Sequence, residues 1–173
     1  MSREASEQET VRRESLSQIR ELGLNPYPAE LFNITSTSKE IIENYSEENI
    51  TEVVIAGRIM SRRIMGKASF AELKDSFGRI QLYVNRDEIC PEENKMFYNT
   101  VFKKLLDIGD IIGIKGNVFK TKVGETSVMV KEIILLSKSL KPLPLPKSDS
   151  DGNLYDAFTD PEKRYRQRYV DLV

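Results

Sequence analysis

Residues 68–85 read ASFAELK, DSFG and RIQLYVN in succession, which is an alternating segment, a turn and a second alternating segment. The apolar residues on one face of the two segments are Ala71, Leu73, Ile80, Leu82 and Val84. Because successive side chains of a strand point to opposite faces, these five residues indicate the buried side of a sheet. Asp-Ser-Phe-Gly is a favourable turn sequence. The segment therefore predicts an antiparallel hairpin with one face in the core.

The opposite face of this hairpin carries Phe70 among polar side chains. A four-residue turn places Phe70 opposite Tyr83, with Gln81 as a diagonal neighbour. An aromatic ring can stack on an unpaired base, which contributes about 1–3 kcal/mol, and an amide offers a donor and an acceptor to a base edge. We interpret this face as a surface for single-stranded nucleic acid. In the alternative, a register slip or the N-terminal segment buries Phe70, and Gln81 is an ordinary solvated residue.

Three further strands are expected around the hairpin. Apolar and polar residues alternate over residues 52–63, and they do so again over 110–120 and 126–136. Residues 91–106 carry apolar side chains at helical spacing, and Gly109 follows as a stop signal. Three strands, a helix and two strands is the order of the OB-fold. We predict a mainly β protein, a five-stranded OB-fold barrel with a helix between strands 3 and 4 and additional N-terminal helices. A generic α+β sandwich is the alternative.

The remaining segments predict three parts of the chain. Residues 1–48 are expected to form a helical arm, in which Thr37 and Glu40 have the spacing of a capping box. Residues 49–138 form the OB domain. Residues 139–173 begin with alternating prolines and end in a basic run, which we interpret as a linker and the start of a further domain.

The composition limits the chemistry of these residues. The chain of 173 residues has no histidine, and Cys90 is its one cysteine. The commonest general base is therefore absent, and neither a zinc site nor an internal disulfide can form. We predict a binding module with no catalytic residue, metal ligand or cofactor of its own. No apolar run approaches the about 20 residues that span a bilayer, and no secretion signal is evident, so a cytoplasmic protein without a membrane partner is expected.

Charge gives a local signal only, because the net charge is −1. Around the hairpin, the basic residues are Arg58, Arg62, Arg63, Lys67, Lys74 and Arg79, against the acids Glu72 and Asp75. We predict that Arg62, Arg63, Lys67 and Arg79 contact RNA, although such a run can also be a solvated face. Glu132 interrupts an apolar strand, so the strand bulges to turn it outward or a donor accompanies it. On an RNA-facing surface, Glu132 would accept hydrogen bonds from base amino groups.

Several motifs together resemble those of class II lysyl-tRNA synthetases. They are NPYP (25–28), AGRIM (56–60), RRIMGKASF (62–70), LKD (73–75), GRIQLYV (78–84), GDIIG (109–113), PLP (142–144) and RYRQRYVDL (164–172). The resemblance covers most of residues 20–173. The RIMGKASF run and the final arginine–tyrosine run are specific to the lysine enzyme, whereas the others are shared with aspartyl and asparaginyl enzymes.

This resemblance implies an N-terminal OB domain that recognises the anticodon loop of tRNA(Lys). Phe70 would stack on the middle anticodon base, a uracil, Gln81 would hydrogen-bond to it, and Arg63 and Glu132 would help to hold the anticodon. The parent enzyme would be a homodimeric lysine–tRNA ligase that uses ATP and Mg²⁺. Its catalytic motifs would lie beyond the last residue here, so this chain is expected to bind tRNA and to be inactive alone.

Three alternatives remain open from the sequence. The first is a sequence-tolerant module for single-stranded nucleic acid. The second is the anticodon domain of an aspartyl- or asparaginyl-type synthetase. The third is a structural or interaction domain, for example with a dimer contact through the OB face.

Overall fold

The computed structural model describes residues 6–47, 51–143, 147–148, 154–155 and 165, and the chain divides into two compact units, residues 1–140 and 141–173. The elements of the first unit are α1 (Glu7–Glu21), α2 (Ser38–Glu43), β1 (Glu52–Met65), β2 (Ala68–Lys74), β3 (Arg79–Asn85), α3 (Arg86–Ile89), η1 (Phe97–Leu105), β4 (Ile111–Lys120) and β5 (Thr126–Ser137). In the second unit, β6 (Lys147–Ser148) pairs antiparallel with β7 (Leu154–Tyr155).

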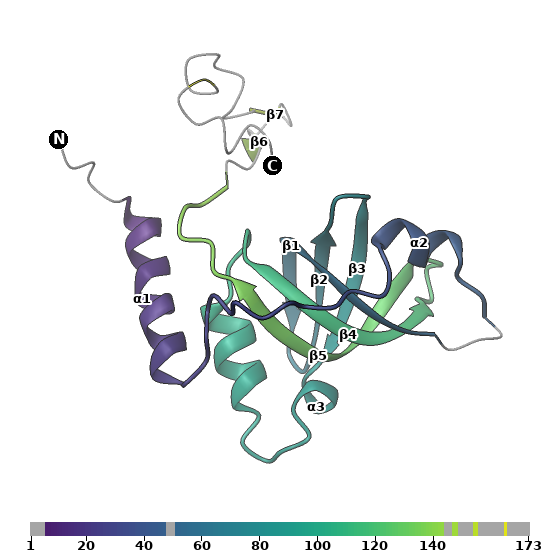
Figure 1. The fold of residues 1–173 in the computed structure, drawn as a ribbon, viewed down its shortest axis with the longest axis horizontal. Helices are drawn as coiled ribbons and strands as arrows, with labels where there is room; N and C mark the ends of the chain where they lie inside the picture. Colours follow the sequence, from purple (N-terminus) through teal and green to yellow (C-terminus); the bar gives the residue numbers. More distant parts are fainter. Residues whose placement is uncertain (1–5, 48–50, 144–146, 149–153, 156–164, 166–173) are drawn as a thin grey trace. The chain divides into compact units, whose positions relative to one another are not determined.

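The first unit is built on a closed barrel of five strands in the order β1-β2-β3-β5-β4 (Figure 1). All neighbouring strands are antiparallel except β3 and β5, which run parallel. This arrangement confirms the predicted OB-fold. It also places the outer surface of β3 beside the start of β5, directly after the hairpin loop between β4 and β5.

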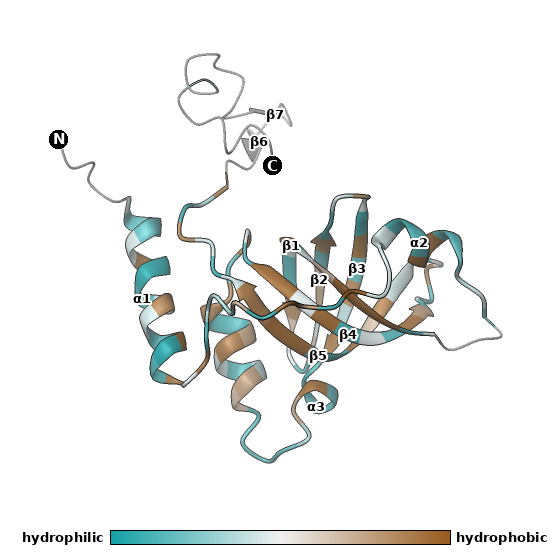
Figure 2. Ribbon diagram, viewed as in Figure 1, coloured by the Kyte–Doolittle hydropathy of each residue, from teal (hydrophilic) through white to brown (hydrophobic). Residues whose placement is uncertain are grey.

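The hairpin of β2 and β3 has the predicted register, with Phe70 opposite Tyr83 and Glu72 opposite Gln81. Its five apolar residues are all at most 3% exposed, as the alternation indicated. Figure 2 shows hydrophobic residues along β4 and β5, which complete the same core. The outer face of the hairpin is thereby free to carry polar and aromatic side chains.

The connection between β3 and β4 differs from the single helix expected over residues 91–106. It contains the short helix α3 and the π-helix η1, in which the Leu106 N–H donates to the Val101 carbonyl over 2.9 Å. Lys95 has a positive φ of 46°, and this conformation interrupts a continuous helix. Tyr98 and Phe102 of η1 are fully buried and stack on one another. The predicted helix therefore exists, but it is shorter and begins later.

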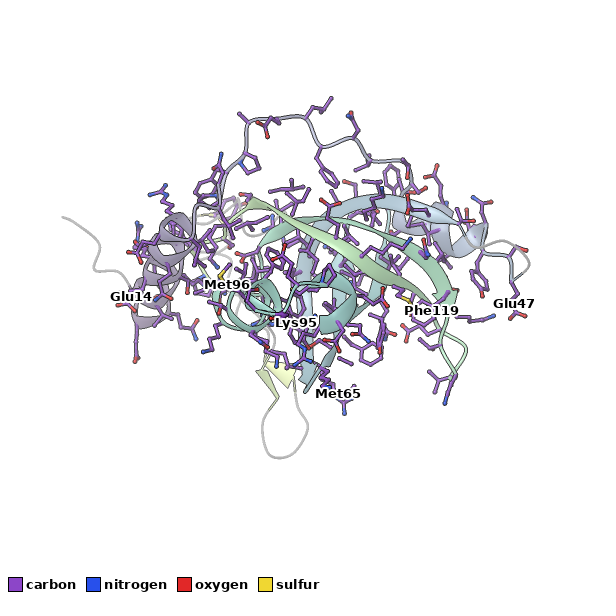
Figure 3. All side chains as sticks on the ribbon, turned by 90° about the horizontal axis from the view of Figure 1, so that it is seen from below. Glu14, Glu47, Met65, Lys95, Met96 and Phe119 are labelled. Atoms are coloured by element: carbon purple, nitrogen blue, oxygen red, sulfur yellow. The ribbon has the colours of Figure 1, made fainter. Side chains whose placement is uncertain are left out.

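The N-terminal helices pack at different places. Helix α1 contacts η1 and buries Ile19 completely, whereas α2 contacts β3. The predicted capping box of Thr37 and Glu40 is present at the start of α2. Figure 3 labels Glu14 of α1 on one side of the barrel and Phe119 of β4 near the other.

Two expectations about the second unit have different outcomes. Its paired strands, β6 and β7, lie within residues 139–173, which were expected to form a linker and the start of a further domain. The basic helical run lies outside the described residues except for Tyr165, which is 81% exposed. Among the helices that the structure describes, none has the length and apolar character needed to cross a membrane.

Candidate nucleic-acid interface

A row of aromatic rings lies on the outer surface of the barrel. The ring centroids of Phe70 and Tyr83 are 5.3 Å apart, with an interplanar angle of 57°. Phe119 extends the row, because its ring meets Tyr83 edge-on at 6.0 Å. Both Phe70 and Tyr83 are half-buried, so each ring keeps an accessible part. The alternative in which a register slip places Phe70 in the core is therefore wrong.

Phe119 was not recognised from the sequence as part of this surface. It lies opposite Ser127 in the pairing of β4 with β5, and Ser127 lies opposite Gln81 in the pairing of β5 with β3. Ser127 thus lies between Phe119 and Gln81, and because its side chain is small, the ring of Phe119 can reach Tyr83. Only the pairing order of the closed barrel brings these residues together, and no local sequence signal contains that order.

The amide of Gln81 is held by two neighbours. Its Nε2 donates to Oε2 of Glu125 over 2.9 Å, and its Oε1 accepts from the Ser127 hydroxyl over 3.0 Å. Glu125 comes from the hairpin loop between β4 and β5, for which the sequence predicted no role. Glu125 and Ser127 are thus two site residues that sequence reasoning missed.

Phe70 and Gln81 line one open groove of about 390 Å³. Its other lining residues are Ser61, Arg63, Ala71, Glu72, Arg79, Ile80, Thr121, Val123 and Glu125. Val123 is 89% exposed at the tip of the hairpin loop, so an apolar side chain stands at the edge of the groove. The groove therefore combines an accessible aromatic ring, an amide, basic groups and two carboxylates.

The two arginines of the groove are in different electrostatic environments. Arg63 lies opposite Phe70 in the pairing of β1 with β2, and its side chain is exposed. Arg79 donates to Glu72 over 2.9 Å, and this ion pair partly neutralises its charge. Arg63 is therefore the better placed of the two to meet a phosphate.

Arg62 does not belong to this surface, contrary to the expectation from its basic neighbours. Its guanidinium donates to the Phe102 carbonyl and lies over the Phe102 ring, 5.7 Å from the centroid. Burial lowers the pKa of Arg62 from its ordinary value, although Asp107 and Asp110 oppose this effect. The side chain fastens η1 to the barrel. Arg62 points away from the groove because β1 has a bulge between Ile59 and Ser61, which reverses the alternation of its side chains.

Glu132 is also separated from the groove. It is exposed and lies opposite Lys115, directly after a register shift in the pairing of β4 with β5. Of the two alternatives for Glu132, the bulge that turns it outward is the one observed, and it makes Ile133 and Leu135 the buried residues. Glu132 lines a different cavity, of about 270 Å³, beside Cys90 and Phe97. The carboxylate that accepts a hydrogen bond from Gln81 is that of Glu125.

Lys67 follows Gly66 in the tight turn between β1 and β2, where Gly66 has a φ of 65°. Its side chain is exposed and does not line the groove. Arg58 also has a structural role, because it donates to the Gly109 carbonyl over 2.7 Å. Of the predicted RNA contacts, the structure thus brings Phe70, Gln81, Arg63, Arg79 and the adjoining Tyr83 together.

Comparisons with known proteins agree with the OB-fold of the barrel. Residues 53–136 match the tRNA anti-codon family, an OB-fold nucleic acid binding domain. The chain is 64% identical over 168 residues to a lysine–tRNA ligase of Christiangramia forsetii, a match that covers 97% of the chain and 29% of that protein. It is 60% identical to a lysine–tRNA ligase of Porphyromonas gingivalis, covering 98% of the chain and 30% of the relative. A lysine–tRNA ligase of Azobacteroides pseudotrichonymphae is 58% identical, with 97% and 34% covered. The chain thus spans about a third of the length of these relatives.

Proposed function

Because this chain belongs to the lysine–tRNA ligase family, we propose that its OB barrel binds the anticodon loop of tRNA(Lys). In this proposal residues 49–138 form the anticodon-binding domain, residues 1–48 an N-terminal arm, and residues 139–173 the connection to a further domain. The whole protein would be a cytoplasmic homodimer that joins lysine to tRNA(Lys) with ATP and Mg²⁺. The described residues contain no cluster of three or more Cys, Asp or Glu side chains fit for a metal ion, so we assign no step through ATP or Mg²⁺ to them.

The observation that carries the proposal is the position of Phe70 beside Gln81 in one open groove. An unpaired base can lie on the accessible part of the Phe70 ring, which would contribute about 1–3 kcal/mol. Tyr83 supports the Phe70 ring from the side, so the stacking surface is held in place before RNA arrives. A base seated there has its hydrogen-bonding edge close to Gln81.

Gln81 provides the groups that suit a uracil in the middle anticodon position. Its Nε2 has a second hydrogen and its Oε1 a second lone pair beyond the bonds to Glu125 and Ser127. Uracil offers an acceptor, O4, next to a donor, N3–H, and the amide can pair with both. Arg63 would contact a phosphate of the same loop, which fixes the loop without distinguishing bases.

The proposal is tested by titrating the 173-residue chain with a tRNA(Lys) anticodon stem-loop and with the same RNA carrying cytosine in the middle position. We expect tighter binding of the uracil loop, and we expect Phe70→Ala to weaken it by about 1–3 kcal/mol while thermal unfolding changes little. The matched control is Phe77→Ala. Phe77 is 63% exposed in the turn between β2 and β3 and does not line the groove.

The outcomes separate the alternatives. Equal binding of the two loops would favour a sequence-tolerant single-strand module. Absence of RNA binding near physiological salt would favour a structural or interaction domain. Preference for an aspartate or asparagine anticodon loop over the lysine loop would favour a synthetase of that type. A Phe70→Ala chain that unfolds at a lower temperature but keeps its affinity would remove Phe70 from the interface.

A further inference from the structure

We propose that Glu125 and Ser127 are positioning residues that hold the Gln81 amide in one of its two orientations and thereby make the site select uracil over cytosine. This inference rests on the proposed function, because it concerns how the same groove recognises the middle base. It adds a specificity mechanism to residues that do not themselves have to touch that base.

The hydrogen bonds determine which end of the amide faces which neighbour. An ionised carboxylate can only accept hydrogen bonds. The amide atom 2.9 Å from Oε2 of Glu125 is therefore the NH₂ group, and the carbonyl oxygen must face Ser127. In the flipped amide, the carbonyl oxygen would face the carboxylate, and two acceptors at that distance repel one another. Glu125 therefore disfavours the flipped orientation.

Ser127 has a different part in the arrangement. Its side chain is fully buried, and its hydroxyl donates to Oε1 of Gln81 over 3.0 Å. The same hydroxyl lies 3.4 Å from the carbonyl of Glu125. A hydroxyl can donate or accept, so Ser127 alone could accommodate either amide orientation. Ser127 therefore fixes the place of the amide, whereas the charge of Glu125 fixes its direction.

The orientation matters because uracil and cytosine present opposite patterns. At neighbouring atoms of the edge, uracil has the acceptor O4 and the donor N3–H, while cytosine has the donor N4–H₂ and the acceptor N3. A glutamine amide can form two hydrogen bonds with either base, but only by turning over between them. A base whose ring is held on Phe70 cannot turn over to compensate. An amide held in one direction is thus complementary to one of the two pyrimidines only.

The deciding variant is Glu125→Gln, which keeps the size of residue 125 but can donate as well as accept, so it can face either end of the Gln81 amide. Its matched control is Glu72→Gln, which removes the same charge from the same groove, at the carboxylate that forms the ion pair with Arg79. Dissociation constants for the uracil and cytosine loops are measured for the 173-residue chain and both variants. Circular dichroism at each titration temperature verifies the fold.

We expect Glu125→Gln to lower the preference for uracil by about tenfold, which corresponds to about 1.4 kcal/mol. Most of this change should come from tighter binding of the cytosine loop. Glu72→Gln should shift both affinities together and leave their ratio unchanged. Ser127→Ala should weaken binding of the uracil loop, and it should lower the preference for uracil over cytosine less than Glu125→Gln does.

Two failures can be distinguished. If the unmodified chain binds both loops equally, the proposed anticodon recognition and this inference fail together. If the unmodified chain prefers uracil and Glu125→Gln prefers it equally strongly, only the inference is overturned. A ratio that changes equally in Glu125→Gln and Glu72→Gln also overturns it, because the effect then follows the charge of the groove and not the direction of the amide.

Discussion

Arg63 of β1 lies directly opposite Phe70 of β2, and it does so because β1 contains one extra residue between Ile59 and Ser61. In an unbroken strand Arg63 would share the face of the buried Ile59 and point into the barrel. The bulge reverses the alternation from Ser61 onward. It places a cation beside the Phe70 ring and turns the neighbouring Arg62 toward η1. One inserted residue thus gives two adjacent arginines different roles.

We expect Arg63→Ala to reduce the salt dependence of RNA binding. One phosphate contact to a single strand contributes about 0.7 to the slope of log K against log salt concentration, so the slope should become shallower by about this amount. The measurement is a series of affinity titrations from low to physiological salt. Arg13→Ala serves as the control, because Arg13 forms an ion pair with Glu9 on α1. An unchanged slope would remove Arg63 from the phosphate contacts.

Arg62→Ala should show the reverse pattern. Loss of its hydrogen bond to the Phe102 carbonyl should reduce the free energy of unfolding by about 1–3 kcal/mol, since this bond involves a charged donor. The salt slope of RNA binding should remain that of the unmodified chain. Urea denaturation provides the first quantity and the titrations above provide the second. A stable Arg62→Ala chain with a shallower slope would show that Arg62 belongs to the interface after all.

Asp75 links α2 to the turn between β2 and β3. Its carboxylate accepts from the backbone and hydroxyl of Ser38, each at 2.7 Å, and from the N–H groups of Phe77 and Gly78, each at 2.8 Å. Partial burial alone would raise the pKa of Asp75, but these hydrogen bonds outweigh it and lower the pKa below its ordinary value. The folded protein therefore holds the ionised form more tightly than the unfolded chain does.

The sign of the resulting pH effect follows from linkage. Because the folded-state pKa is lowered, the stabilisation is present above the ordinary aspartate pKa of about 4 and is lost as the pH falls through the folded value. Asp75→Asn should be less stable than the unmodified chain by about 1–3 kcal/mol near neutral pH, and the difference should shrink below about pH 4. Urea denaturation at several pH values measures this. Glu14→Gln, an exposed site on α1, is the control, and a pH-independent difference would contradict the assignment.

The accuracy of the sequence predictions varied with how local each feature was. Strand alternation and one four-residue turn, both within residues 68–85, place Phe70 opposite Tyr83 and Gln81 close to them. These relations could therefore be predicted from the sequence. The bulge in β1 follows Ile59, the last buried apolar residue of that strand, so the hydrophobic pattern gave no sign of it and the alternation could not place Arg62 correctly. In β5 the sequence indicated a bulge near Glu132, but the position of Glu132 on the barrel depended on the pairing of β4 with β5. Glu125 was missed because a loop residue gains its neighbour Gln81 only when the barrel closes.

An ion pair in the core joins Lys138, directly after β5, to Asp110, directly before β4. Both side chains are completely buried, and Lys138 Nζ lies 2.9 Å from Oδ2 of Asp110. Lys138 also donates to Asp107, and Asp110 accepts from the backbone of Ser139 over 2.7 Å. Lys138→Met should therefore cost about 3–5 kcal/mol of unfolding free energy, because it leaves a buried carboxylate without its cation.

The pH dependence of this loss identifies its cause. Burial raises the pKa of Asp110 above its ordinary value even with Lys138 present, although that cation and the hydrogen bonds oppose the shift. Without the cation the pKa should rise further, so lowering the pH protonates Asp110 in the folded Lys138→Met chain and removes the buried charge. The penalty should consequently be smaller at about pH 5 than at about pH 7. Adding Asp110→Asn to Lys138→Met should recover part of the stability at neutral pH, since an amide carries no charge to be buried. A double-mutant cycle by urea denaturation measures the coupling, and additive losses would show that the two residues stabilise the barrel independently.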